Sequence, residues 1–357
     1  MSSAAPTTEP FLPNPSWNPA PAEPRGAEEV RRFHQTLPDY AVTPLVPLPT
    51  VAAALDLGSV LVKDESMRLG LPAFKMLGAS WAVHRALSSG NYDQPRLVTA
   101  TDGNHGRAVA RMAALLDLPA TVVVPNGVSE RAIELIEKEG ADVRVLDAPY
   151  DEAVRRASAL ADDDPNALLI QDTSWPGYED VPQWIVDGYA TLFDETSEQA
   201  TTLGAGIDLL VVPAGVGSLA HAAVLFGRTR PDCRVVVVEP VVAGCLQASL
   251  SAGEPITVPT GETNMAGLNC GTPSYLAWPD LQRGLAGAVV VDDDATADAV
   301  SDLRVLGVDS GPCGAASLAA LRILATEPAR SSLGLDPESS IVLLNTEGAD
   351  ASGHAPT

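Results

Sequence analysis

One lysine of this chain stands in surroundings that could give its amine chemical use. Lys75 is one of only three lysines, and it lies within the apolar run Leu71-Pro-Ala-Phe-Lys-Met-Leu-Gly78. An ammonium beside apolar side chains is costly to desolvate, so we expect the pKa of Lys75 to fall and its neutral amine to serve as a nucleophile. A lysine whose stem packs on the core while its head reaches water would give the same pattern. Two further motifs favour the nucleophile.

A glycine turn joins a strand to a helix at Val211-Val-Pro-Ala-Gly-Val-Gly-Ser-Leu-Ala220. Gly215 and Gly217 let bare backbone N–H groups converge at the start of an alanine-rich helix that Ser218 could cap. Such a turn suits an anion such as a phosphate monoester. The segment lacks the Lys-Ser/Thr pair of a nucleotide-triphosphate loop and the third glycine of a dinucleotide fingerprint. The alternative is a turn that only connects strand and helix.

The third motif, Thr99-Ala-Thr-Asp-Gly-Asn-His-Gly106, also lies between a strand and a helix. Thr101, Asn104 and the first amides of the helix could hold a carboxylate and a phenolic oxygen, while Gly103 frees the backbone. A helix start capped by Asp102 or Asn104 is the simpler interpretation, but it explains only one of these polar residues. We interpret the neighbouring histidine as a packed, hydrogen-bonded side chain rather than a proton shuttle.

Strand and helix patterns alternate along most of the chain. Apolar runs predict buried strands at 97–100, 120–124, 143–146, 168–170, 209–212, 235–238, 288–291 and 341–344. Helices are expected at 104–116, 129–139 and 150–161. Buried strands separated by single helices are typical of parallel sheets with right-handed crossovers. We therefore predict an α/β fold with two parallel-sheet α/β domains and catalytic groups at the carboxyl ends of strands.

Charge and hydropathy exclude several classes of partner. With 46 acidic and 22 basic side chains, the net charge of −24 would repel nucleic acid. No apolar stretch approaches the roughly 20 residues that cross a bilayer, and no basic region followed by an apolar segment opens the chain. We expect a cytoplasmic protein without membrane contact.

Four cysteines offer no metal site. Cys233, Cys245, Cys270 and Cys313 form no CxxC pair and have no histidine at ligand spacing. We expect reduced thiols and no bound metal, although Cys245 and Cys270 could meet around a pocket.

The three motifs, in this order, resemble those of the pyridoxal-phosphate enzymes with the tryptophan-synthase-β fold, also called fold type II. Within that group the chain is most similar to the diaminopropionate ammonia-lyase family, and the resemblance spans about residues 40 to 350. The shared segments are Asp-Glu-Ser at 64–66, Ala-Phe-Lys-Met-Leu-Gly at 73–78, Thr-Ala-Thr-Asp-Gly-Asn-His-Gly-Arg at 99–107, Asp-Thr-Ser-Trp-x-Gly-Tyr at 172–178, Glu-Pro at 239–240, Met-Ala-Gly-Leu at 265–268 and Asn-Thr-Glu-Gly at 345–348.

The resemblance implies that pyridoxal 5'-phosphate is bound covalently by Lys75, which also removes the substrate's Cα proton. Asn104 would bond the phenolic oxygen of the cofactor, and Thr346 would face its pyridine nitrogen. A hydroxyl there makes the ring a weaker electron sink than a carboxylate would, which favours prompt loss of a β-substituent. The phosphate would be cradled by Gly215, Val216, Gly217 and Ser218.

Two carboxylates bear on the substrate. The resemblance also separates this chain from serine and threonine dehydratases, which have a small residue at the position of Asp102. Asp102 could attract a β-ammonium or act as a base on the face opposite Lys75, which would let both enantiomers react. Asp172 is a second candidate for recognising an amino group. The expected catalytic residues are Lys75, Asp102 and Asp172, and the substrate would contact Thr101, Asp102, Gly103 and Asp172.

One segment departs from the family. The corresponding segment of the family is similar to Ser-Gly-Glu-Ser-Gly-Ala, whereas this chain has Ser310-Gly-Pro-Cys-Gly-Ala315. An acidic group expected near the cofactor ring is therefore missing. The segment could form a tight turn before a helix at 315–325.

The expected organisation has three parts. Residues 1–27 would form a mobile Pro/Ala-rich arm, since their composition cannot bury enough surface to offset chain ordering. Residues 28–90 with 180–357 would form a large cofactor-binding domain, and residues 91–179 a small α/β domain. The resemblance also implies a homodimer.

The preferred hypothesis is a carbon–nitrogen lyase of amino-acid catabolism that converts 2,3-diaminopropionate, by β-elimination, to pyruvate and two molecules of ammonia. A serine/threonine dehydratase-like or other β-substituted amino-acid lyase is the first alternative. A non-catalytic protein that binds pyridoxal phosphate is the second.

Overall fold

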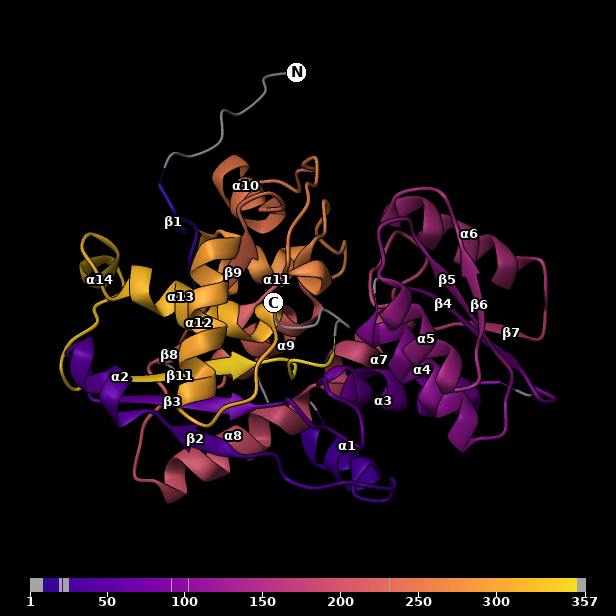
Figure 1. Cartoon of the computed structure of the whole chain (residues 1–357), viewed down its shortest axis with the longest axis horizontal. Coiled ribbons are helices and arrows are strands. Elements are labelled where there is room, and N and C mark those ends of the chain that lie inside the picture. Colours follow the sequence, from indigo (N-terminus) through magenta and orange to yellow (C-terminus); the bar gives the residue numbers. More distant parts are fainter. Residues whose placement is uncertain are drawn as a thin grey trace.

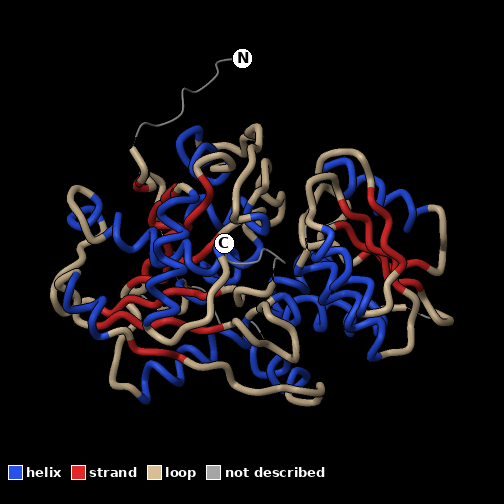
Figure 2. Tube along the Cα trace, in the orientation of Figure 1, coloured by secondary structure: helices blue, strands red, loops and turns tan. Residues whose placement is uncertain are grey.

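The computed structural model describes residues 9–18, 21, 26–90, 92–101, 103–230 and 232–351. These residues form two β-sheets of seven and four strands. Figure 1 shows the larger sheet with its helices on the left and the smaller sheet on the right, and Figure 2 shows the two groups of strands in red. The predicted α/β fold with two parallel-sheet layers is confirmed.

The larger sheet has the strand order β1-β10-β9-β8-β11-β3-β2. Its five central strands run parallel, whereas β1 and β2 pair antiparallel at the two edges. The strands are β1 (Phe11–Pro13), β2 (Leu45–Pro47), β3 (Ser59–Asp64), β8 (Leu209–Pro213), β9 (Arg234–Pro240), β10 (Leu285–Val291) and β11 (Ser340–Asn345).

Both faces of this sheet are buried, which explains its uninterrupted apolar strands. Successive side chains of a strand point to opposite faces. In β8, Leu210 and Val212 belong to one hydrophobic core, and Leu209 and Val211 belong to another on the opposite face. Because helices cover both faces, the valine- and leucine-rich runs are favoured over an alternating apolar and polar pattern.

Part of the segment expected to be a mobile arm is ordered. Phe11 pairs with Val289 of β10, and its side chain is only 7% exposed. Its ring packs where Gly287 carries no side chain. Burial of this phenyl ring helps to offset the cost of ordering, a contribution that the average composition of the segment hides. Residues 1–8, 19–20 and 22–25 of the expected arm lie outside the described residues.

The smaller sheet is entirely parallel, with the order β6-β5-β4-β7. Its strands are β4 (Arg96–Ala100), β5 (Ala120–Val124), β6 (Asp142–Val145) and β7 (Ala167–Leu169). The connecting helices α4 (Asn104–Leu115), α5 (Glu130–Lys138) and α6 (Tyr150–Asp162) each agree with the predicted helices to within one residue at either end.

The remaining helices surround the larger sheet or lie between the sheets (Figure 1). They are α1 (Ala27–His34), α2 (Pro49–Ala54), α3 (Lys75–Ser88), α7 (Asp180–Gly188), α8 (Ala190–Thr202), α9 (Ser218–Gly227), α10 (Cys245–Ala252), the 3-10 helix η1 (Ala266–Leu268), α11 (Trp278–Gly284), α12 (Asp293–Val305), α13 (Pro312–Leu324) and α14 (Ala329–Ser332). Helix α3 packs on both α4 and α7, so it links the smaller sheet to the larger one. Among the described residues, no helix is long and apolar enough to cross a membrane.

Candidate active site

A pocket lies where strands of both sheets end. Its lining comes from the segments that follow β4, β7, β8 and β11, joined by the start of α3. This is the position predicted for the catalytic groups, since parallel sheets leave a crevice at the carboxyl ends of their strands. The predicted site residues that line the pocket are Lys75, Thr101, Gly103, Asn104, Asp172, Gly215, Val216, Gly217, Ser218 and Thr346. Asp102 lies outside the described residues.

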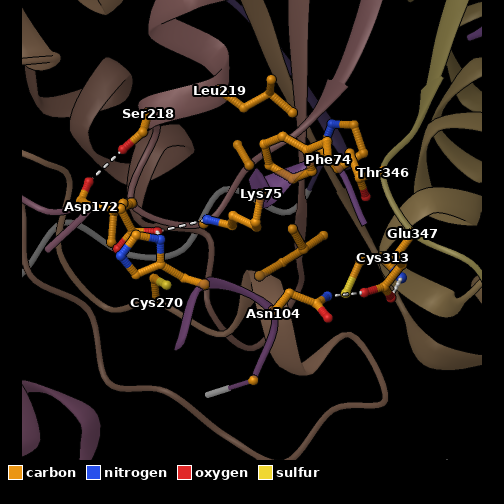
Figure 3. A pocket seen from close by; sticks show the side chains of 18 of the residues that line it. Phe74, Lys75, Asn104, Asp172, Ser218, Leu219, Cys270, Cys313, Thr346 and Glu347 are labelled. Atoms are coloured by element: carbon orange, nitrogen blue, oxygen red, sulfur yellow. Dashed lines mark hydrogen bonds and ion pairs between the residues drawn. The ribbon is translucent and has the colours of Figure 1, made fainter. Parts of the chain in front are cut away.

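Lys75 is the first residue of α3 and points into this pocket (Figure 3). Its Nζ donates a hydrogen bond to Oδ2 of Asp172 over 2.7 Å, and it lies 5.3 Å from the centre of the Phe74 ring. The Lys75 side chain is 20% exposed and the Asp172 side chain 7% exposed. The amine is therefore largely shielded from water and held by a buried carboxylate.

The predicted fall in the pKa of Lys75 is wrong. Burial lowers this pKa, but the Asp172 carboxylate and its hydrogen bond outweigh burial and raise the pKa above its ordinary value. Burial alone would raise the pKa of Asp172, yet the charge of Lys75 and its hydrogen bond hold this pKa at about 2. The ion pair therefore stores a proton on Nζ, and the amine becomes nucleophilic only when that proton leaves.

His105 packs against this ion pair as a neutral side chain. Its Nε2 donates to the carbonyl oxygen of Ile170 over 2.8 Å, because a carbonyl can only accept. Its Nδ1 lies 3.9 Å from Oδ2 of Asp172 and has no hydrogen-bond partner among the described residues. Burial lowers the pKa of His105. These contacts agree with the interpretation of a packed histidine.

The glycine turn between β8 and α9 forms another wall of the pocket. Gly217 is the N-cap residue of α9 and has a φ of 99°, a conformation that favours glycine. A Cβ atom on Gly215 would lie 2.9 Å from the Sγ of Cys270, so a side chain there would crowd the turn. The bare backbone at the amino end of α9 suits a phosphate.

Ser218 does not cap α9 as expected. It is the first residue of the helix, and its hydroxyl donates to the backbone oxygen of Asp172 over 2.6 Å. This bond fixes the glycine turn to the segment that carries the carboxylate partner of Lys75.

Thr101 shapes the loop that follows β4. Its Oγ1 accepts hydrogen bonds from the backbone N–H groups of Gly103 and Gly106, at 2.9 and 3.0 Å. Gly103 occupies the N-cap position of α4, and Asn104 is the first residue of the helix rather than its cap. Asn104 instead donates through its Nδ2 to another side chain that lines the pocket.

That acceptor is Glu347, which the sequence interpretation missed. Its carboxylate accepts from Nδ2 of Asn104 over 2.8 Å and from the backbone N–H of Cys313 over 3.2 Å. Helix α13 begins at Pro312, three residues before the predicted start at residue 315. The Glu347 carboxylate lies against this first turn of the helix. The signal available was the position of Glu347, three residues after the last predicted strand.

The four cysteines are buried and form no disulfide. Cys245 and Cys270 both lie beside Gly215: the Cys245 thiol is 3.9 Å from its carbonyl oxygen, and Cys270 crowds its Cα. Among the described residues, no group of three or more His, Cys, Asp or Glu side chains is arranged to hold a metal ion.

The pocket therefore combines an amine, a bare-backbone anion site, a side-chain amide and a hydroxyl. An aldehyde could condense with Lys75, while a phosphate on the same ligand could accept hydrogen bonds from the turn at 215–218. Thr346 lines the pocket as well and is 4% exposed. These residues fit the cofactor that the sequence resemblance implies.

Comparisons with known proteins point the same way. A family model described as pyridoxal-phosphate dependent enzyme matches residues 36–347. The diaminopropionate ammonia-lyase of Salmonella typhimurium is 37% identical over 358 residues, covering 90% of this chain and 88% of the relative. The selenomethionine-containing holo diaminopropionate ammonia lyase of Escherichia coli superposes with a TM-score of 0.88 at 31% identity, covering 96% of this chain and 94% of that one. Its complex with D-serine superposes with a TM-score of 0.86 at 30% identity, covering 96% and 95%.

Proposed function

The chain belongs to the pyridoxal-phosphate-dependent enzyme family, and from this premise we propose that it converts 2,3-diaminopropionate to pyruvate and two molecules of ammonia. It is a carbon–nitrogen lyase of fold type II, and pyridoxal 5'-phosphate is its cofactor. One observation carries the proposal: Lys75, the glycine turn, Asn104 and Thr346 line a single pocket. Similarity to diaminopropionate ammonia-lyases over nine-tenths of the chain selects this substrate over serine or threonine.

Each part of the cofactor has a proposed partner. Lys75 would hold the aldehyde through its Nζ, and the turn from Gly215 to Ser218 would hold the phosphate through backbone N–H groups. Asn104 would donate to the phenolic oxygen, and Thr346 would offer its hydroxyl to the pyridine nitrogen. When bound, the cofactor withdraws electrons from the substrate's Cα and makes its proton acidic. The support for these roles is that all of these residues line the pocket.

Lys75 and Asp172 manage one proton between them. Nζ and Oδ2 are 2.7 Å apart, so a proton can pass along an existing hydrogen bond. Once the proton on Nζ has left, the neutral amine of Lys75 can attack an aldehyde or accept a proton from the substrate's Cα. The proton taken from Cα then stays on Nζ, and Lys75 can donate it to the departing β-amino group. The Asp172 carboxylate stabilises the Lys75 ammonium between the two steps.

Asp102 is proposed as a second acid–base group from the sequence alone. A carboxylate on the face opposite Lys75 could remove the Cα proton of the other enantiomer. The D-serine complex of the E. coli enzyme supports the idea that this family admits D-amino acids. We therefore expect both enantiomers of 2,3-diaminopropionate to react.

The cellular setting is also part of the proposal. Four cysteines without a disulfide are usual in a reducing compartment and support a cytoplasmic location. A homodimer is proposed from the family resemblance. The substrate is a small amino acid, and neither nucleic acid nor a membrane is needed.

The decisive experiment measures both products from purified protein loaded with pyridoxal phosphate. We expect pyruvate and ammonia from 2,3-diaminopropionate in a ratio of one to two. Keto acid should be released much more slowly from L-serine and L-threonine. Borohydride reduction followed by peptide mapping should find the cofactor on Lys75, and Lys75→Ala should lose both the adduct and the activity. Faster release from serine or threonine would identify a dehydratase instead. A coloured protein that releases no keto acid would identify a non-catalytic binder.

A further inference from the structure

Glu347 is a buried carboxylate that the proposed chemistry leaves unused. It follows β11, is 2% exposed and lines the pocket. Its Oε2 accepts from Nδ2 of Asn104 over 2.8 Å, and its Oε1 accepts from the backbone N–H of Cys313 over 3.2 Å. Figure 3 shows the hydrogen bond between Asn104 and Glu347, with Cys313 beside it. A charged group buried this far is costly unless its contacts compensate, so these hydrogen bonds matter.

The start of α13 is shaped to receive this carboxylate. A Cβ atom on Gly311 would lie 2.7 Å from Oε1 of Glu347, so any other residue there would displace the carboxylate. The backbone N–H of Gly311 also donates to the backbone oxygen of Glu347 over 3.0 Å. Glu347 is thus fixed from the side of the larger sheet through both its backbone and its side chain.

The contact with Asn104 determines which way the amide faces. A carboxylate only accepts hydrogen bonds, so the atom of Asn104 that meets Oε2 must be Nδ2 rather than Oδ1. An amide nitrogen carries two hydrogens, and the second can donate to a ligand oxygen in the pocket. An amide turned the other way would present a carbonyl oxygen to an anionic phenolate and repel it.

The same contact joins the two sheets. Asn104 begins α4 and follows β4 of the smaller sheet, whereas Glu347 follows β11 of the larger sheet, 243 residues later in the chain. Both residues line the pocket and also the cleft that adjoins it. The pair therefore spans the boundary between pocket and cleft.

We propose that Glu347 is a positioning residue that fixes the Asn104 amide with its NH₂ group toward the cofactor and holds the two sheets together across the pocket. The inference rests on the proposed function, because it takes Asn104 as a contact of pyridoxal phosphate. It adds a role to a residue that does not itself touch the reacting atoms.

The first test is Glu347→Gln, measured as the affinity of the cofactor-free protein for pyridoxal phosphate in an absorbance titration. A glutamine offers one accepting oxygen where two donors, Asn104 and Cys313, now require two. We expect affinity to fall on the order of tenfold, the usual effect of losing a hydrogen bond to a charged group. The matched control is Glu338→Gln, the same change at an exposed position, which should leave the affinity unchanged.

A double-mutant cycle separates positioning from general stability. If Glu347 acts through Asn104, Glu347→Gln should change the affinity little further in an Asn104→Ala background. Melting of the cofactor-free variants reports whether each one folds. Where Glu347→Gln does not fold, Glu347→Asp keeps both accepting oxygens and should show a smaller, equally Asn104-dependent loss.

Two results would overturn the inference. One is an unchanged affinity in Glu347→Gln, and the other is additive losses in the cycle. Either can occur while the wild-type protein binds the cofactor and releases pyruvate, so the proposed function would stand. A wild-type protein that binds no pyridoxal phosphate would instead contradict the proposed function itself.

Discussion

The ion pair between Lys75 and Asp172 sets the protonation of the candidate nucleophile. The two side chains come from elements that are 97 residues apart in the chain, and they meet because α3 and the end of β7 both border the pocket. A lysine in an apolar run would lose its proton easily, yet the carboxylate reverses that tendency. The pH at which the amine becomes reactive is therefore a property of the pair.

Replacing Asp172 with asparagine should move this pH downward. Loss of the carboxylate leaves burial as the dominant influence, so the pKa of Lys75 falls and the amine is neutral at lower pH. We expect the pH profile for condensation of pyridoxal phosphate with the cofactor-free protein to shift by about one unit or more toward acid. The growth of absorbance after mixing, followed at several pH values, measures it.

The control for this experiment is Asp298→Asn, a change at an exposed aspartate on α12, which should leave the profile in place. A profile that stays fixed in Asp172→Asn, or that moves toward alkali, would contradict the assigned partnership.

At this scale the sequence predicted which residues meet but not their charge states. Lys75, Asp172 and Ser218 were all placed correctly in one pocket by motif and by their positions after strands. The sign of the Lys75 pKa shift could not be predicted, because it depends on a side-chain distance that only the folded chain defines. Glu347 was overlooked for a similar reason, since a lone glutamate after a strand does not reveal its partners.

Among the elements, the turn between β8 and α9 depends most on its residue types. Gly217 has positive φ, and a Cβ there would lie 2.8 Å from the Cδ1 of Leu281. The helix start remains open toward the pocket because no side chain of the turn fills it. Phosphate binding thus requires both the backbone N–H groups of the turn and the lack of side chains at its glycines.

Gly217→Ala tests this dependence. The left-handed conformation costs an alanine about 1 kcal/mol, and displacement of the turn should weaken pyridoxal phosphate binding by tenfold or more. Gly253→Ala is the matched control, because Gly253 also has positive φ (75°) but has open space around its Cα. It should lower stability without changing the cofactor affinity in a titration. Equal affinities in the two variants would refute the proposed cradle.

The elements also show where pattern reading succeeds. The valine-rich strands β5, β8 and β9 were predicted because burial on both faces leaves an unbroken apolar run. Strand β3 was missed, since Lys63 interrupts it. That lysine is fully buried, and its Nζ bonds to Glu195 of α8 over 2.9 Å, so a polar interruption in the sequence is a satisfied ion pair in the fold.

Across the whole molecule, buried titratable groups form contacts between elements that are distant in the chain. They include His34 of α1 and the Lys63–Glu195 pair between β3 and α8. His34 of α1 is fully buried and bonds to Thr191 and to the carbonyl of Leu77. Burial lowers its pKa from the ordinary 6.5 to about 4. Burial would raise the pKa of Glu195, but Arg68 and Lys63 lower it from 4.5 to about 2.

These two shifts predict stability that falls as the solution becomes acidic. In both cases the unfolded chain binds the proton more tightly than the folded one, so protonation favours unfolding. The stability that depends on His34 should be lost as the pH falls from 6.5 to 4, and that of Glu195 as it falls from 4.5 to 2. Urea unfolding at a series of pH values measures the free energy directly. In His34→Gln the decline across the first window should be shallower than in the wild-type protein, and an identical slope would count against the assignment.

We propose that the chain divides into two domains near residues 91 and 179. The smaller sheet is formed by residues between 96 and 169, whereas every strand of the larger sheet lies outside that interval. Residues 28–90 and 180–357 then form the larger domain. Strand β1 pairs within the larger sheet, so part of the segment before residue 28 belongs with it as well.

The two outer strands of the larger sheet have a consequence for contacts between copies of the chain. Each has three residues, runs against its neighbour and ends in a proline, Pro13 in β1 and Pro47 in β2. Short strands with a residue that lacks an N–H group are poor templates for a further strand. Neither edge of the larger sheet therefore favours pairing with a strand of another molecule, which lowers the tendency of its valine-rich strands to aggregate. A dimer of this chain is therefore not expected to form by extension of the larger sheet.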